Sequence, residues 1–81
     1  MQGSARAHLN FLMSELHAGS AYAEDARFST DPDRRDRGLR YARQAHTAVT
    51  QIRDRMELAP SDAERLAEGL AKLADAIRAA E

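Results

Sequence analysis

Apolar residues recur at alternating spacings of three and four in three separate stretches of the chain. The first stretch carries a stripe of Leu9, Leu12, Leu16, Gly19, Ala23 and Ala26. The second carries Ala42, Ala45, Val49, Ile52 and Met56, and the third carries Ala63, Leu66, Leu70, Leu73, Ile77 and Ala80. This spacing places each stripe on one face of an amphipathic helix, and no stretch alternates as a strand does. We therefore expect three helices, over residues 5–28, 32–57 and 62–80.

Polar residues near the start of the chain and at the first break predict where the first two helices begin. Ser4 is a suitable N-cap for the first helix. In the break "STDPD", Asp31 is a good N-cap for the second helix. Pro32 suits the first helical position, because the N–H that proline lacks would have no partner there.

The second break, "LAPSDAERL", predicts the start of the third helix. Pro60 pushes Ala59 away from helical geometry, so the second helix should end before it. Ser61 and Glu64 have the S-x-x-E spacing of a capping box, in which each side chain binds the backbone N–H of the other residue.

The two breaks are short, so helices that follow each other in the sequence should be antiparallel. Three amphipathic stripes can then close on a single core, and the heptad spacing predicts left-handed crossings near +20°. The sequence therefore predicts an all-α fold, an antiparallel left-handed three-helix bundle that forms a single domain over residues 1–81.

A repeated pattern links the first two helices. "GSAYAEDA" at residues 19–26 and "GLRYARQA" at residues 38–45 share the skeleton G-x-x-Y-A-x-x-A. Glycine inside a helix costs about 1 kcal/mol relative to alanine, so a packing reason is expected. If the hairpin turns at Thr30, Gly19 lies level with Tyr41, and Gly38 lies level with Tyr22. We expect each glycine to be a hole that receives the opposite tyrosine ring, although Gly38 has a second reading as a loosened first turn.

The same pattern resembles the helical pairs of tetratricopeptide repeats, in which a glycine and a tyrosine also stand three residues apart in the first helix. The likeness covers Gly19 to Tyr22 and the alanines that follow. One repeat length after Gly19 the chain has Arg53, and no second copy of the repeat begins there. The resemblance therefore implies a shared way of packing two helices.

The lengths and flanks of the helices suggest an interaction surface. The third helix is the shortest, so it should end short of the first turn and leave the residues there less covered. Phe11 lies off the main stripe, on one flank with Ala18 and Tyr22, and this flank either packs against the third helix or binds another chain. The predicted interaction surface comprises Phe11, Ala18, Tyr22, Phe28 and Leu39. Since a chain of 81 residues has a small core, we expect a homodimer in preference to a monomer.

The start of the second helix is rich in arginine, with Arg34, Arg35, Arg37, Arg40 and Arg43. These side chains could bind phosphates, with Tyr41 stacked on a base. Alternatively they form a solvated face, because Asp33 and Asp36 each stand four residues before an arginine, the spacing of helical ion pairs. The net charge of −1 gives the chain no overall basic field. We expect an acidic protein partner for these arginines before a nucleic acid.

The residues with catalytic or metal-binding chemistry are few and scattered. His8, His17 and His46 lack the spacing of a metal-binding helix, no calcium-loop pattern occurs, and cysteine is absent. No glycine-rich loop follows a strand, so a nucleotide site is not indicated. A bundle of this size also has little room for a ligand pocket of ~300 Å³. We therefore expect no enzyme, no cofactor and no metal.

The beginning of the chain lacks a basic segment followed by an unbroken apolar stretch, so we expect no secretory signal. No apolar run reaches the ~20 residues that span a bilayer. With no cysteine, these features favour a cytoplasmic protein without membrane contact. The favoured function is a small helical protein–protein interaction module, and the alternative is a nucleic-acid-associated accessory protein that uses the arginines of the second helix.

Overall fold

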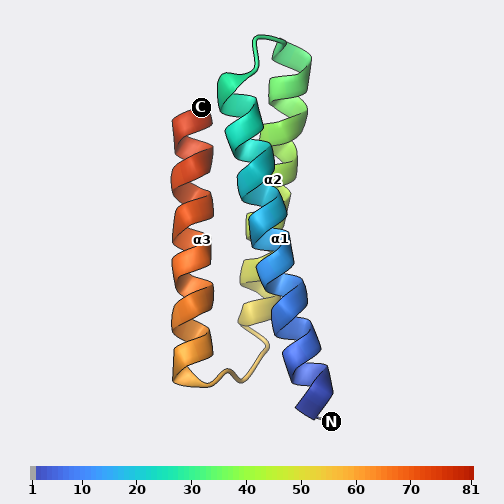
Figure 1. The fold of residues 1–81 in the computed structure, drawn as a ribbon, viewed down its shortest axis with the longest axis vertical. Coiled ribbons are helices and arrows are strands. Elements are labelled where there is room, and N and C mark those ends of the chain that lie inside the picture. The colour runs from blue at the N-terminus through green and yellow to red at the C-terminus, as the bar shows by residue number, and fades with distance from the viewer. Residues whose placement is uncertain (1) are drawn as a thin grey trace.

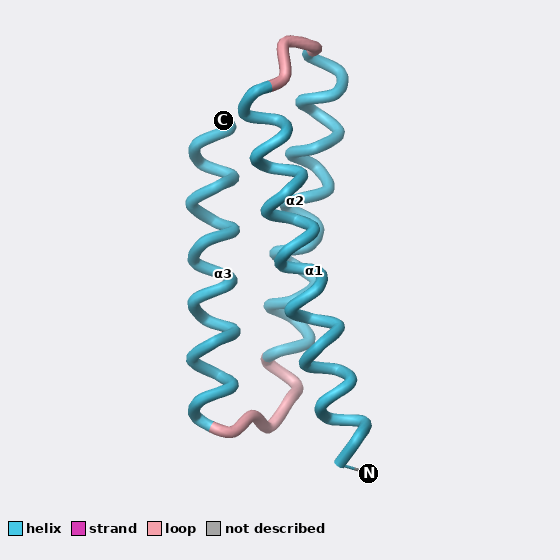
Figure 2. The backbone as a smooth tube through the Cα atoms, in the orientation of Figure 1, coloured by secondary structure: helices cyan, strands magenta, loops and turns pink. Residues whose placement is uncertain are grey.

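The computed structural model describes the backbone of residues 2–81 and the side chains from Arg6 onward. Its helices are α1 (Gln2–Phe28), α2 (Pro32–Arg53) and α3 (Pro60–Ala80). They form an all-α three-helix bundle of 45 × 18 × 16 Å, as the sequence predicts. α1 and α2 are antiparallel, and α3 lies beside them in the direction of α1 (Figure 1). The two connections lie at opposite ends of the bundle (Figure 2).

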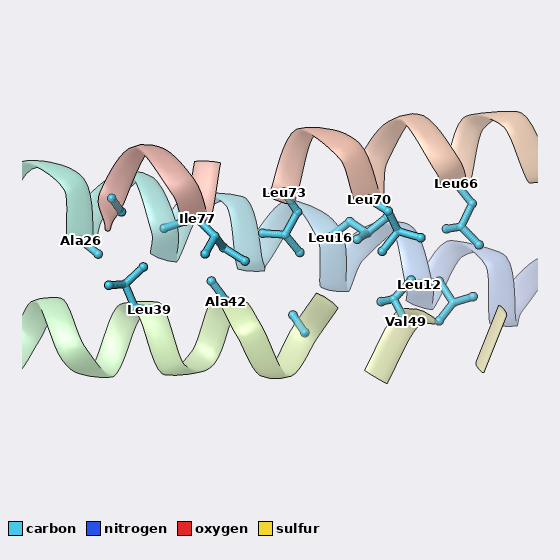
Figure 3. Close-up of a cluster of buried hydrophobic side chains, with 13 residues drawn as sticks. Leu12, Leu16, Ala26, Leu39, Ala42, Val49, Leu66, Leu70, Leu73 and Ile77 are labelled. Carbon is cyan, nitrogen blue, oxygen red and sulfur yellow. The ribbon is translucent and has the colours of Figure 1, made fainter. Parts of the chain in front are cut away.

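One apolar core runs through the bundle, and the helices contribute side chains of different sizes to it (Figure 3). α3 supplies large side chains, which are Leu66, Leu70, Leu73 and Ile77. The α1–α2 hairpin supplies four alanines, which are Ala23, Ala26, Ala42 and Ala45, together with Leu12, Leu16, Leu39 and Val49. The predicted stripes identified most of this core. Ile52 is an exception, because it is 36% exposed.

The turn between α1 and α2 forms as its sequence predicts. The side chain of Asp31 caps α2 by accepting a hydrogen bond from the backbone N–H of Asp33, with an N···O distance of 3.0 Å. Pro32 occupies the first turn of α2. Ser29 adds a further local bond, because its Oγ accepts from the backbone N–H of Asp31 at 3.2 Å. The turn is therefore fixed by short polar side chains.

The start of α1 differs from the prediction. The helix begins at Gln2, so Ser4 lies inside it and is not the residue that precedes it. A helix anchored further along by Leu12 and Leu16 continues outward until a residue opposes helical geometry, and no proline stands near Ser4. The side chain of Ser4 lies outside the described side chains.

The start of α3 also differs. α3 begins at Pro60, its N-cap is Ala59, and no side chain caps it, so the capping box of Ser61 and Glu64 is wrong. Proline is favoured in the first helical position, and this places the boundary before Ser61. The backbone carbonyl of Ala59 accepts the first helical hydrogen bond, from the N–H of Ala63 at 2.9 Å.

α2 ends at Arg53, four residues before the predicted end at residue 57. The chain tightens there, because Arg55 and Met56 donate to carbonyl groups only three residues back, at 3.0 and 3.1 Å. This turn directs the chain toward α3 and allows Met56 and Leu58 to pack, partly buried, against the core. Burial of these two side chains thus replaces the last helical turn.

Candidate interaction surface

Tyr22 and Tyr41 lie side by side at the outer edge of the α1–α2 interface. Their ring centroids are 4.3 Å apart, with a tilt of 31° between the ring planes. Each tyrosine is 45% exposed. Each one also precedes a buried alanine, Ala23 or Ala42, by one residue, which rotates its side chain about 100° away from the core. The rings therefore contact each other and leave their outer faces to solvent.

Gly19 and Gly38 bring the helices together, and the prediction that they receive tyrosine rings is wrong. A Cβ atom on Gly19 would lie 3.1 Å from the Cβ of Ala45 and 3.2 Å from a methyl carbon of Leu73. A Cβ on Gly38 would lie 2.9 Å from the backbone carbonyl oxygen of Tyr22. Gly38 is thus level with Tyr22, as predicted, but it makes room for backbone. It is buried within α2, which excludes a loosened first turn.

Two further exposed apolar residues continue the edge formed by the tyrosines. Phe11 stands eleven residues before Tyr22, and Ile52 stands eleven residues after Tyr41. Eleven residues are close to three helical turns, so each helix presents its two residues on one face. Because the helices are antiparallel, Phe11 and Ile52 fall at similar levels. Phe11 is 55% and Ile52 is 36% exposed, and we name these four residues the apolar seam.

The flank of α1 that carries Phe11, Ala18 and Tyr22 faces α2 rather than α3. The contact between Tyr22 and Tyr41 establishes this orientation. The reading in which the flank packs against the third helix is therefore wrong. Ala18 is half-buried and lies on the same flank, four residues before Tyr22.

Phe28 is also exposed, but it lies on a different face. Its side chain is 70% exposed, and the guanidinium carbon of Arg27 is 5.1 Å from the centre of its ring. Phe28 stands six residues after Tyr22, which places it about 120° away around α1. It is therefore exposed at the end of α1, as predicted, and outside the apolar seam.

The far end of α3 is bound to α2 by Arg35. Its guanidinium donates to the backbone carbonyl of Ala80 through Nε at 3.2 Å and Nη2 at 2.6 Å, and Nη2 lies 3.4 Å from the carbonyl oxygen of Glu81. Carbonyl groups at a helix C-terminus lack helical partners, so a cation is favourable there. α3 therefore reaches this turn of α2, where Leu39 is only 7% exposed. The predicted exposure of Leu39 is wrong.

Two other arginines of the predicted anionic-partner set form ion pairs within the bundle. Arg34 binds both carboxylate oxygens of Asp25, at 2.9 and 3.1 Å, and joins α2 to α1. Arg43 binds a carboxylate oxygen of Glu81 at 2.5 Å. All four side chains are about half exposed to solvent, so each pair contributes little to stability. These contacts occupy groups that an anionic partner would use.

Arg37 and Arg40 are exposed on the same helix. The ion pairs expected from Asp33 to Arg37 and from Asp36 to Arg40 do not form within 4 Å among the described side chains. Solvent around an exposed helix face screens such charges, so the i, i+4 spacing alone does not hold the two groups together. The arginine-rich start of α2 is therefore a mixture of bundle contacts and solvated charges.

A shallow groove runs between α1 and α3, on the side of α1 away from the apolar seam. Its volume is about 500 Å³, which contradicts the expectation that the bundle has little room for a pocket. Small residues on the outer flank of α3, including Gly69 and Ala76, leave this space. Charged side chains surround it, which are Glu24, Arg27, Arg65, Glu68 and Lys72. The groove is open to solvent, and its charged rim surrounds a lining that includes the apolar side chains of Met13 and Leu16.

The histidines are separated in the fold as they are in the sequence. His8 and His17 are exposed on α1, whereas His46 is half-buried on α2 and its backbone carbonyl accepts a bond from Thr50 Oγ1 at 2.8 Å. Within residues 2–81, no three histidine or carboxylate side chains gather closely enough to hold a metal ion. No helix in this range combines the length and hydropathy that a bilayer crossing requires.

Sequence reasoning missed Ile52 as a surface residue, and it placed Tyr41 against a glycine or, in the alternative, on a nucleic-acid base. The signal that identifies both is the eleven-residue spacing, which occurs from Phe11 to Tyr22 and again from Tyr41 to Ile52. A strict alternation of three and four placed Ile52 in the core stripe. The true period of an α-helix, 3.6 residues, rotates Ile52 off that stripe by the end of α2.

Comparisons with protein-family models, with curated proteins and with solved structures found no match to this chain.

Proposed function

We propose that this protein is a small helical protein–protein interaction module that binds its partner along the apolar seam and has no chemistry of its own. One observation carries the proposal. Four of the five large apolar side chains that the bundle exposes, Phe11, Tyr22, Tyr41 and Ile52, share one edge of the α1–α2 hairpin. Isolated exposed apolar residues are common on soluble proteins, but several large ones gathered on one edge are typical of a binding surface.

The chemistry of the seam fits a protein partner. Aromatic side chains supply large contact areas with few rotatable bonds, and they are enriched where binding energy concentrates. The tyrosine hydroxyl groups can keep their hydrogen bonds while the rings are covered. Between the two ends of the seam, α1 offers Ala18 and α2 offers Ala48, so a partner can approach the helix backbones closely.

The interior of the bundle supports a binding role over catalysis. Among the described residues, no polar or charged side chain is buried. Catalysis depends on polar groups held in fixed, desolvated positions, and this core provides none. The absence of cysteine supports a cytoplasmic location, which we include in the proposal.

Site-specific photo-crosslinking tests the proposal. A benzophenone side chain at Phe11 should give a covalent adduct with another protein chain in cells that make the protein, because Phe11 lies at one end of the seam. The same group at Phe28 is the matched control, because Phe28 is more exposed but faces elsewhere. Equal adduct yields from the two positions, or none from position 11, would contradict the proposal.

A further inference from the structure

We infer that the partner of the apolar seam is a second copy of this chain, bound across a two-fold axis that crosses the middle of the seam. This inference rests on the proposed function, since it names the partner of the same surface. In the resulting dimer, the tyrosine pair of one copy covers Phe11 and Ile52 of the other copy. The two hairpins then pack face to face as four central helices, with α3 of each copy on the outside.

The layout of the seam is self-complementary. Its large side chains lie in two pairs, Tyr22 with Tyr41 and Phe11 with Ile52, about 16 Å apart along the helices. A two-fold axis midway between the pairs exchanges them, so that each pair of one copy meets the other pair of its partner. A homodimer with closed symmetry requires a surface of this kind, in which one patch contacts itself.

The middle of the seam is shaped for close approach near the axis. Ala18 lies between Phe11 and Tyr22, and Ala48 lies between Tyr41 and Ile52. Small side chains at the centre let the two hairpins meet without separating the large pairs at the ends. Gln44 and Gln51, also on α2 between the pairs, are uncharged and can form hydrogen bonds across the interface.

The exposed area of the bundle matches what such a dimer needs. The chain exposes 5768 Å². A compact monomer of the same mass exposes about 4,900 Å², so the excess is roughly 900 Å². A stable protein–protein interface of ordinary size buries about 800 Å² on each partner. An interface of that ordinary size would remove most of the excess area that the elongated shape leaves exposed.

Glu15 gives the inference a residue-specific consequence. Glu15 is half-buried on α1, between Phe11 and Tyr22. If histidine is taken as neutral, Glu15 is the one charged residue of α1 between these two positions. The proposed axis brings the Glu15 carboxylates of the two copies toward each other. Like charges across an interface oppose binding, so Glu15→Gln should tighten the dimer severalfold.

Sedimentation equilibrium of the full chain tests the inference. The wild type should sediment as two chains at micromolar concentration. Phe11→Glu should weaken association on the order of 30-fold or more, because a large aromatic side chain covered at an interface supplies much of the binding energy. Ala48→Arg should do the same from the middle of the seam, and because Ala48 is exposed, this variant keeps the monomer folded. Phe28→Glu should leave the association unchanged.

The outcomes separate this inference from the proposed function. A wild-type protein that stays a single chain up to about 1 mM overturns self-association. A dimer that resists both Phe11→Glu and Ala48→Arg overturns the seam as its interface. If the protein is monomeric but benzophenone at position 11 still couples to a different protein in cells, only the inference fails. If neither a dimer nor an adduct forms, the proposed function fails with it.

Discussion

The contact between α1 and α2 and the contact of α3 with this hairpin are made by side chains of different sizes. α1 and α2 meet through glycine and alanine, so close that a Cβ on Gly38 would press on the backbone of α1. α3 meets the hairpin through leucine and isoleucine side chains and through the Arg35 bond to its last turn. The first contact leaves two tyrosines half exposed at its edge, whereas large side chains fill the second.

This difference explains why the apolar seam lies where it does. Helices separated only by small residues cannot bury large side chains at the edges of their interface, because those side chains have no space between the backbones. Tyr22 and Tyr41 are therefore stacked outside the α1–α2 contact. On the α3 side, the leucines point into the core, and small and charged residues line the open groove between α1 and α3. Most of the large apolar side chains that remain exposed therefore lie on the hairpin edge.

The largest effect should come from shortening a side chain that α3 contributes. Leu73 is fully buried, and its methyl groups lie beside Gly19. Leu73→Ala should cost about 2–5 kcal/mol of unfolding free energy, because a cavity remains where the neighbours cannot collapse. A domain of this size has on the order of 5 kcal/mol in total, so the variant should retain at most about 3 kcal/mol and melt well below the wild type.

Leu73→Met is the matched control for that prediction. It conserves most of the volume and should cost less than about 1.5 kcal/mol. Urea unfolding followed by circular dichroism, at one fixed protein concentration for all variants, gives both values. Equal stability of Leu73→Ala and the wild type would mean that α3 does not supply the core.

The next effect compares a glycine on each side of α1. A Cβ on Gly38 would lie 2.9 Å from the carbonyl oxygen of Tyr22, and backbone atoms cannot move without shifting a helix. Gly38→Ala should therefore destabilise the protein by about 1–3 kcal/mol, despite the better helix propensity of alanine. A Cβ on Gly69 would lie 2.7 Å from a terminal methyl carbon of Leu16, whereas the other Leu16 atoms near it are at ordinary contact distance. Leu16 lines the open groove, so its methyl group can move, and Gly69→Ala should be neutral or stabilising by up to about 1 kcal/mol.

Thermal unfolding of Gly38→Ala and Gly69→Ala, measured side by side, provides the comparison. The melting temperature should fall for the first variant and stay constant or rise for the second. If instead Gly38→Ala melted at the higher temperature, the α1–α2 contact would have room for a Cβ atom, and the small residues there would not be required.

The start of α2 and the positions of most core residues were the predictable part of this fold, because they depend on local rules. Asp31 and Pro32 define the start of α2 because capping and proline geometry act within one turn. Where two local rules competed at the start of α3, the preference of Pro60 prevailed over the capping pattern of Ser61. The sequence carries no simple signal of which rule is stronger.

The contacts of the tyrosines and arginines were less predictable, because they depend on rotation around the helix as well as position along it. Counting from Thr30 placed Gly38 near Tyr22 correctly, but helix phase directed the Tyr22 ring to Tyr41. Arg35 appeared in the sequence as one of five similar arginines. Its bond to Ala80 depends on where α3 ends, which no pattern around Arg35 describes.

A smaller effect should distinguish the arginine that binds α3 from its neighbour in the sequence. Arg35→Ala removes donors to the last carbonyl groups of α3 and should cost about 1 kcal/mol. Arg34→Ala breaks an ion pair whose side chains are 60% and 47% exposed, so it should cost less than about 0.5 kcal/mol. Amide hydrogen exchange in the last turn of α3 should accelerate only in Arg35→Ala, and acceleration in both variants would refute the distinction.

The tyrosines themselves provide the most direct test of the central claim, which is that the apolar seam is covered by a second copy of the chain. The protein has no tryptophan and only two tyrosines, both in the seam, so its intrinsic fluorescence reports on this surface alone. Quenching by acrylamide should weaken as the protein concentration rises, with the same midpoint as dimer formation, and in Phe11→Glu this midpoint should lie on the order of 30-fold higher or more. Equal quenching of the wild-type protein across the whole concentration range would contradict the claim.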